Sequence, residues 1–146
     1  MKLNQLSLFL ENKPGQLKVP CGILAKAGIN IVTLSLADTQ QFGILRLIVK
    51  DVAKARKVLE DGGCVVNLTE VLAVDVPDRP GGLFDVLDVL DHAALAIEYM
   101  YAFTCGPHAN KATMVFRFED PDAAIKALAA KGINIVGPAE LFERIN

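Results

Sequence analysis

The stretch Leu10-Glu11-Asn12-Lys13-Pro14-Gly15-Gln16-Leu17 recurs later in the chain as Val76-Pro77-Asp78-Arg79-Pro80-Gly81-Gly82-Leu83, so that the second proline follows the first by 66 positions. The likeness continues beyond this stretch. Residues 27–31 correspond to residues 93–97 at the same offset, and residues 51–55 correspond to residues 120–124 with three additional residues in the second copy. A repeat of this length indicates one small domain that is present twice.

The duplication divides the 146 residues of the chain into two domains, which we place at residues 1–69 and 70–146. A domain of about 70 residues buries only about 60% of the surface of its unfolded chain and is marginally stable alone. We therefore expect the two copies to share an interface. No segment rich in proline, serine or glycine separates them, because residues 65–76 are almost continuously apolar or strand-forming.

Composition excludes several classes of protein. A net charge of −2 and a pI near 5.6 argue against a nucleic-acid-binding surface, which needs clustered lysine and arginine. Three cysteines without a C-x-x-C pair favour a reducing compartment. The sequence shows no signal peptide and no apolar run near the ~20 residues of a membrane helix. We expect a cytoplasmic protein that contacts neither nucleic acid nor membrane.

The pattern of apolar residues predicts the same order of elements in both copies. In the second copy, Leu83, Val86, Leu87 and Leu90 have the i, i+3, i+4, i+7 spacing of one helix face. The corresponding residues of the first copy are Leu17, Pro20, Cys21 and Leu24. Proline is tolerated only near a helix start, so we expect an irregular first turn, with Cys21 on the core face.

Each copy reads as β-α-β-β-α-β, the ferredoxin-like order. In the first copy the strands are expected at residues 6–10, 29–38, 43–50 and 64–68, and Asp51 is expected to cap the second helix. In the second copy they are expected at residues 71–76, 96–104, 113–118 and 133–136, with Asp120 as the cap and Pro121 at the first helical position. Residues 140–145 could add an edge strand or a short helix.

The sequence offers few candidates for catalysis. His92 and His108 lie far apart and have no second ligand residue at metal-binding spacing, and His92 is expected at a helix C-terminus, where a cationic ring is favourable. No phosphate loop, G-x-G-x-x-G or G-x-S-x-G motif occurs. We therefore expect no enzyme activity, no metal and no cofactor.

The two Pro-Gly loops are the best candidates for a binding site. Each joins a strand end to a helix start, where glycine permits close approach of the backbone and free amides can bind a carboxylate. Asn12 and Asp78 supply oxygen atoms for an ammonium group, so the pair of features fits an α-amino acid. The alternative is that Asx-x-Pro-Gly is only good turn chemistry, but its presence in both copies favours a binding loop.

The chain resembles a tandem pair of ACT domains, which are small-molecule-sensing modules attached to phosphoglycerate dehydrogenase, aspartate kinase and acetolactate synthase. The matching segments are residues 11–17, 27–31 and 78–83. The resemblance implies an α+β fold in which two ferredoxin-like units lie side by side, with an eight-stranded antiparallel sheet and the helices on one face. It also implies that a loop residue of one unit and a strand residue of the other clamp one amino acid.

In this chain the resemblance assigns the clamp to Asn12 and Asn30 in the first copy and to Asp78 and Ala96 in the second. Alanine lacks the amide of the clamp, which is a departure from the family pattern. A second Gly-Ile-Asn-Ile sequence, at residues 132–135, falls on an expected fourth strand and is not assigned to the site. The full set of expected ligand-binding residues is Asn12, Lys13, Pro14, Gly15, Gln16, Leu17, Asn30, Ile31, Asp78, Arg79, Pro80, Gly81, Gly82, Leu83, Ala96 and Ile97.

The sequence therefore predicts a stand-alone, non-catalytic sensor that binds an amino acid between two ACT domains, regulates a partner enzyme or pathway, and forms a homodimer. Two alternatives stay open. One is a structural pairing module without a ligand. The other is a small enzyme, since ferredoxin-like folds host many chemistries.

Overall fold

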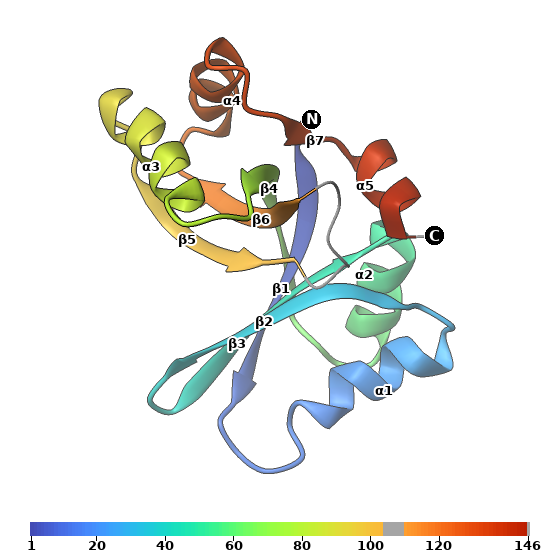
Figure 1. Ribbon diagram of the computed structural model, residues 1–146. Coiled ribbons are helices and arrows are strands. Elements are labelled where there is room, and N and C mark those ends of the chain that lie inside the picture. The colour runs from blue at the N-terminus through green and yellow to red at the C-terminus, as the bar shows by residue number, and fades with distance from the viewer. Residues whose placement is uncertain (104–109, 146) are drawn as a thin grey trace. The chain divides into compact units, whose positions relative to one another are not determined.

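The computed structural model describes residues 1–103 and 110–145 (Figure 1), so Cys105 and His108 lie outside the described residues. The chain divides into two compact units. The first unit is Asn4–Thr69, and the second unit is Met1–Leu3 together with Glu70–Asn146. None of the helices in the described parts of the chain is long and apolar enough to span a membrane.

The first unit has the predicted order of elements. They are β1 (Leu3–Glu11), α1 (Lys18–Lys26), β2 (Ile31–Thr39), β3 (Phe42–Val49), α2 (Val52–Asp61) and the beginning of β4 (Val66–Pro77). β3 is antiparallel to both β1 and β2. The cap at Asp51 is confirmed, because its carboxylate accepts a hydrogen bond of 3.1 Å from the Lys54 amide.

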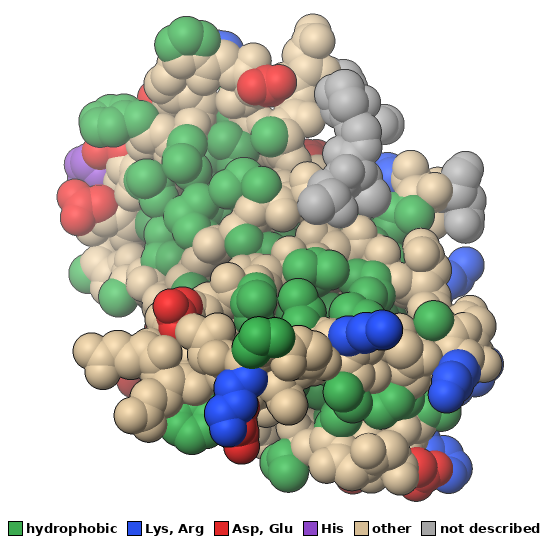
Figure 2. Space-filling model, turned by 90° about the horizontal axis from the view of Figure 1, so that it is seen from below, with side chains coloured by type: hydrophobic (Ala, Val, Ile, Leu, Met, Phe, Trp, Pro, Cys, Tyr) green, Lys and Arg blue, Asp and Glu red, His purple; other side chains and the backbone are tan. Residues whose placement is uncertain are grey.

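The core of the first unit lies between the helices and one face of the strands, as the alternation of apolar residues predicts. It consists of Leu6, Leu8, Leu24, Leu45, Leu47, Val49, Ala55, Leu59 and Val66. On β2, Leu34 and Leu36 keep 42% and 51% of their surface exposed. Hydrophobic groups are also visible among charged ones on the face drawn in Figure 2.

Helix α1 begins irregularly, as predicted. It starts at Lys18, so Pro20 lies within its first turn, whereas the corresponding helix of the second unit starts at Gly82. Pro20 and Leu24 are buried, but Cys21 is only half-buried. The prediction that Cys21 belongs to the core is therefore only partly right. Leu87, its counterpart in the second unit, is likewise half-buried, so this position lies at the edge of the buried helix face in both copies.

The second unit repeats the order and adds one helix. Its elements are the rest of β4, α3 (Gly82–His92), β5 (Ile97–Ala102), β6 (Lys111–Phe118), α4 (Pro121–Ala130), β7 (Ile135–Val136) and α5 (Pro138–Ile145). The Asp120 carboxylate accepts a hydrogen bond of 3.0 Å from the Ala123 amide, and Pro121 opens α4, so this predicted helix start is confirmed.

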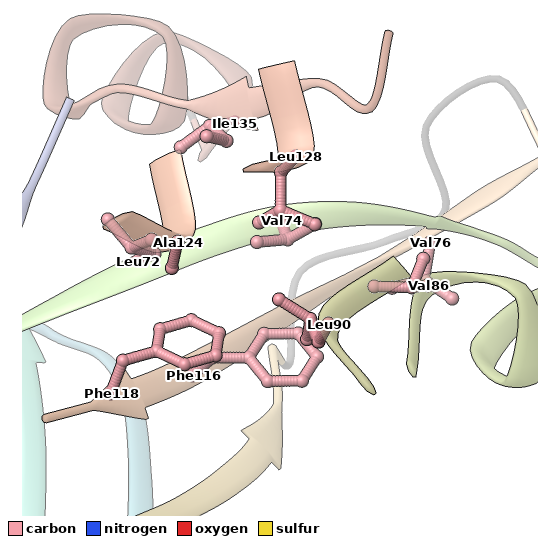
Figure 3. Close-up of a cluster of buried hydrophobic side chains, with 10 residues drawn as sticks. All are labelled: Leu72, Val74, Val76, Val86, Leu90, Phe116, Phe118, Ala124, Leu128 and Ile135. Atoms are coloured by element: carbon pink, nitrogen blue, oxygen red, sulfur yellow. The ribbon is translucent and has the colours of Figure 1, made fainter. Parts of the chain in front are cut away.

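The core of the second unit is drawn in Figure 3, where residues of β4 and β6 lie against residues of α3 and α4. The rings of Phe116 and Phe118 stack with their centroids 5.8 Å apart. The buried residues are Leu72, Val74, Val76, Val86, Leu90, Phe116, Phe118, Ala124, Leu128 and Ile135.

The expectation of an eight-stranded sheet is wrong, because the described residues form a sheet of seven strands. Their order is β2-β3-β1-β4-β6-β5, and β7 pairs with β4. The reason is that Val66–Pro77 forms one uninterrupted strand of 12 residues. No proline or glycine interrupts residues 66–76, so nothing in the backbone ends the strand between the two copies. One strand therefore replaces the two that the repeat predicts.

Residues 140–145, for which the sequence left an edge strand or a short helix open, belong to the helix α5. Successive side chains of a strand point to opposite faces, so Asp75 faces away from Val74 and Val76, which pack on α3 and α4. Arg144 of α5 binds the Asp75 carboxylate. The segment that follows the second repeat is therefore a helix on the opposite face of β4.

Candidate functional site

The two Pro-Gly loops have the same backbone conformation. Gly15 in loop one (residues 12–17) has φ +87°, and Gly81 in loop two (residues 78–83) has φ +83°. The Asn12 amide donates a hydrogen bond of 2.9 Å to the Gln41 carbonyl, and the Asp78 amide donates one of 2.9 Å to the Asn110 carbonyl. Each loop is thus anchored in the same way to the residues next to β3 or β6. The duplication has preserved a loop geometry as well as a sequence.

Glycine has a different role at each position of loop two. Gly81 needs glycine because positive φ strains other residues. Gly82 needs it because a Cβ there would lie 1.9 Å from the Pro77 carbonyl oxygen. Position 16, which corresponds to Gly82, carries glutamine. Gly82 is the first residue of α3, whereas α1 begins only at Lys18, so position 16 lies outside its helix. The two loops therefore diverge after their common Pro-Gly turn.

Neither helix that follows a loop is capped by a side chain at its start. Leu17 precedes α1 and Gly81 precedes α3, and neither makes a side-chain capping hydrogen bond. The first amides of a helix have no partner inside the helix. The start of α3 is therefore able to donate hydrogen bonds to a carboxylate. The start of α1 offers fewer donors, because the Val19 amide already donates to the Gln16 carbonyl at 3.4 Å and Pro20 has no N–H group.

The side chain of Asn12 is already engaged. Its Nδ2 atom donates to Asp38 Oδ1 at 3.2 Å and to the Gln40 carbonyl at 3.4 Å. Lys13 next to it forms an ion pair with Glu11 at 2.9 Å. Side chains of loop one are therefore bound to residues of their own unit.

The side chain of Asp78, in contrast to that of Asn12, is not engaged by described residues. It is exposed and accepts no hydrogen bond and forms no ion pair with residues that the structure describes. Its neighbour Arg79 is bound to Asp85 Oδ2 at 2.7 Å and to the Pro80 carbonyl at 3.2 Å. Loop two is therefore fixed to α3 by Arg79, while the carboxylate of Asp78 stays available to an ammonium group.

A small pocket of about 160 Å³ lies beside loop one. It brings together three of the predicted site residues, Asn12, Lys13 and Leu17, with residues of β2 and β3 that the sequence did not indicate. The remaining predicted residues of loop one do not line it. The complete lining is Leu10, Glu11, Asn12, Lys13, Leu17, Leu36, Ala37, Asp38 and Gly43.

The predicted strand residues lie away from the loop of their own unit. Asn30 is exposed just before β2 and does not line the pocket beside loop one. Ala96 is exposed just before β5 and lines a separate depression with Leu95 and Asp120. Ile31 and Ile97 follow these residues and are half-buried. Within a single unit, the structure does not join loop and strand into one site.

Sequence reasoning missed a buried polar cluster in the second unit. Asp75 is 5% exposed and accepts two hydrogen bonds from Arg144, at 2.9 and 3.0 Å, and one from Asn134 at 2.8 Å. Thr113 donates to the same carboxylate at 3.3 Å, and Glu140 pairs with Arg144. The signal that could have revealed the cluster is a single acid inside an apolar strand, because such an acid needs partners.

The surroundings of Asp75 act on its pKa in opposite directions. Burial raises the pKa of this carboxyl group, whereas the hydrogen bonds from Arg144 and Asn134 and the charges of Arg144 and Lys111 lower it. The partners outweigh burial, so the pKa of Asp75 lies below its ordinary value. The group is a structural anion at neutral pH.

Two further reactive side chains among the described residues, His92 and Cys64, have ordinary structural explanations. His92 is exposed at the end of α3, where its Nδ1 atom lies 2.7 Å from the Asp88 carbonyl. That hydrogen bond and the charges of Asp88 and Asp91 raise the pKa of His92. Burial raises the pKa of the Cys64 thiol, which disfavours the reactive thiolate.

Comparison with known proteins agrees with this fold over almost the whole chain. The protein-family model of the ACT domain pair matches residues 1–145. The crystal structure of protein BT0572 from Bacteroides thetaiotaomicron is 40% identical, with a TM-score of 0.89, and the match covers 98% of this chain and 97% of that one. No curated protein sequence matches the chain significantly.

More distant structures share the fold. The regulatory subunit of aspartate kinase from Thermus thermophilus, in its ligand-free form, is 16% identical with a TM-score of 0.60, and the match covers 87% of this chain and 91% of that one. The regulatory subunit from Thermus flavus is 17% identical with a TM-score of 0.58, with 87% and 90% covered. The resemblance inferred from the duplicated loops is confirmed, and the chain belongs to the ACT domain pair family.

Proposed function

We propose that the chain is a regulatory module whose Pro-Gly loops bind a small amino acid and that it thereby controls a partner enzyme or pathway. The observation that carries the proposal is the preserved geometry of the two loops, with Gly15 and Gly81 at φ +87° and +83° and the same 2.9 Å anchor in each unit. If the loops served only as turns, the two copies would not need the same backbone conformation at glycine, nor a helix start without a side-chain cap in both.

The proposed chemistry assigns one part of the ligand to each feature of the loop. The carboxylate accepts hydrogen bonds from the first amides of α1 or α3. The ammonium group donates to Asn12 Oδ1 or to the Asp78 carboxylate. In the arrangement that the ACT resemblance implies, the second contact comes from the strand start of the other unit, so that Asn30 completes loop two and Ala96 completes loop one.

The regulatory role is supported by analogy of fold. The Thermus proteins are named regulatory subunits of aspartate kinase, and at their level of identity the likeness extends to the fold alone. We infer from it the kind of role, a ligand-dependent effect on another protein. The amino acid and the partner are to be found by experiment.

A thermal-shift screen of the purified chain against the common amino acids tests the proposal. A ligand at 100 times its dissociation constant adds about 2.7 kcal/mol to the free energy of unfolding, so a true ligand raises the melting temperature in a concentration-dependent way. Failure of every amino acid to do so contradicts the proposal.

Glycine variants then locate the binding. Gly15→Val and Gly81→Val should weaken binding, because each puts a branched side chain on a backbone with positive φ and blocks close approach. Gly63→Val is the matched control. Gly63 has φ +91° and, like Gly15, has no atom within 4 Å of an added Cβ, but it lies outside both loops. Equal loss of affinity in the control contradicts binding at the loops.

The second candidate function is a structural pairing module without a ligand. Loop one favours it, since Asn12 is bound by Asp38 and Gln40 of its own unit. On this hypothesis the loops only join strand to helix. A screen without stabilising ligands, together with glycine variants that change stability alone, would favour this candidate.

We further propose that the chain forms a homodimer. β2 is an end strand of the sheet, and end strands expose unpaired backbone groups that can pair with another chain. Two large apolar side chains of β2, Leu34 and Leu36, are also exposed. An end strand with apolar side chains is a suitable surface for a second copy.

A further inference from the structure

The repeat builds a second feature twice, a cavity next to the turn that leaves the second helix of each unit. The first-unit cavity has a volume of about 350 Å³ and the second-unit cavity about 290 Å³. Both volumes are near the lower end of the range of about 300–1,000 Å³ for small-molecule sites. Neither cavity contains a residue of the Asn30 or Ala96 strand starts.

The two cavities are equivalent because the turns that border them are equivalent. Gly63 has φ +91° and Gly132 has φ +69°. The amide after each glycine donates back to the helix in the same way, from Cys64 to the Leu59 carbonyl at 2.9 Å and from Ile133 to the Leu128 carbonyl at 3.1 Å. Positions around the two cavities can therefore be compared one by one.

The comparison shows that apolar or small residues of the first cavity are replaced by polar ones in the second. Phe9 corresponds to Asp75, Val19 to Asp85, Gly62 to Lys131 and Val65 to Asn134. Among the described lining residues of the first cavity, Glu11 is the one charged residue, and it is paired with Lys13. The lining of the cavity thus has four charged residues in the second unit, Asp75, Asp85, Lys111 and Lys131, against one in the first.

The charges of the second cavity do not cancel. Asp75 is bound by Arg144, and Asp85 is bound by Arg79 at 2.7 Å. Two lysines of the lining, Lys111 at the start of β6 and Lys131 at the end of α4, form no ion pair with the residues that the structure describes. The charge of Lys111 also acts on the Asp75 carboxylate, and Arg144 is shared between Asp75 and Glu140. The lining and its ion-pair partners together still carry a net positive charge, and the ammonium groups of Lys111 and Lys131 stay available to a ligand.

Another part of the lining consists of apolar side chains that pack on the core. Val86 is buried, and Val89 and Ile133 are half-buried and pack on the hydrophobic core of the second unit. A charged molecule with a short carbon chain can satisfy both parts of the lining, because its chain covers the apolar wall while its ends remain at the lysines.

We propose that the cavity bordered by α3, the start of β6 and the α4–β7 turn is a second ligand site, distinct from the Pro-Gly loops, for a small organic dianion. Its two negative groups pair with Lys111 and Lys131, and its carbon chain lies against Val86, Val89 and Ile133. The first-unit cavity, which lacks both lysines, does not bind such a ligand. This site does not depend on amino-acid binding at the loops.

Calorimetry and amide NMR on the whole chain test the proposal, with malonate, succinate and glutarate as dianions and succinamide as the uncharged match of succinate. At least one dianion should bind, succinamide should not, and affinity should fall as salt is added. The amides of Ile133 and Asn134 should shift in the NMR titration, whereas those of Cys64 and Val65 should not. Absence of binding by all three dianions up to about 10 mM overturns the proposal.

Lysine variants locate the ligand. Lys111→Gln and Lys131→Gln should each raise the dissociation constant about fivefold or more, and the double variant should bind no dianion. Lys126→Gln is the control, since Lys126 is an exposed lysine of α4 outside the cavity. All these side chains are exposed, so the variants should fold. Binding that persists in the double variant, or that is lost in Lys126→Gln or Gly81→Val, overturns the second site.

Discussion

Arg144 donates two hydrogen bonds to Asp75 across 69 positions of sequence, at 2.9 and 3.0 Å, and both side chains are largely buried. This pair fixes the C-terminal helix α5 to β4. A buried carboxylate is tolerated there because Arg144, Asn134 and Thr113 all donate to it.

Replacement of Arg144 by methionine should destabilise the second unit strongly. The change leaves a buried charge without its main partner, which costs about 3–5 kcal/mol. Urea unfolding followed by circular dichroism measures the loss. Glu140→Gln, which removes only the exposed partner of Arg144, should cost less than about 1 kcal/mol. Equal losses in the two variants would contradict the assignment.

The same pair predicts acid sensitivity. The pKa of Asp75 is lower in the folded chain than its ordinary value of 3.8, so the unfolded chain takes up the proton first as the pH falls. The stabilisation is therefore fully present above about pH 4 and is lost as the pH falls through the lower, folded-state pKa.

Urea unfolding of the wild type and of Asp75→Asn over this pH range checks the sign. The difference in unfolding free energy between the two proteins should shrink as the pH is lowered below about 4. A difference that stays constant or grows toward acid would show that the folded state does not favour the ionised carboxylate.

The two loops should differ in affinity. Asp78 offers a free negative charge, whereas Asn12 is neutral and already donates to Asp38 and Gln40. Hydrogen bonds to a charged group contribute about 1.5–3 kcal/mol, against about 1 kcal/mol for neutral ones, so loop two should bind about tenfold more tightly. In calorimetry with the best ligand, Asp78→Ala should therefore lose more affinity than Asn12→Ala. Equal losses, or a larger loss for Asn12→Ala, would contradict the asymmetry.

The proposed homodimer should depend on the exposed residues of β2. Leu36→Lys places a charge on an end strand, which opposes pairing with another strand, so the variant should sediment as a monomer at concentrations where the wild type is a dimer. Val65→Lys is the control, because Val65 is 75% exposed but precedes β4. A wild type that is monomeric, or a dimer that survives Leu36→Lys, would show that β2 is not the interface.

The sequence alone determined those features that depend on neighbouring residues. The order of strands and helices follows from local apolar periodicity, and the helix starts at Asp51 and Asp120 follow from a side chain that binds an amide three residues later. The Pro-Gly turns follow from the conformations that proline and glycine allow. Each of these rules acts within one or two helical turns, so the duplicated sequence displays it twice.

Only the tertiary structure decided the features that join distant residues. The sequence did not show that one strand serves both copies, that α5 lies on the opposite face of β4, or that Asn12 is held by Asp38 while Asp78 stays free. Partners such as Asp75 and Arg144 meet only after the strands and helices have packed. Pairing of this kind depends on three-dimensional distance and burial, and neither quantity is encoded in the local pattern of the chain.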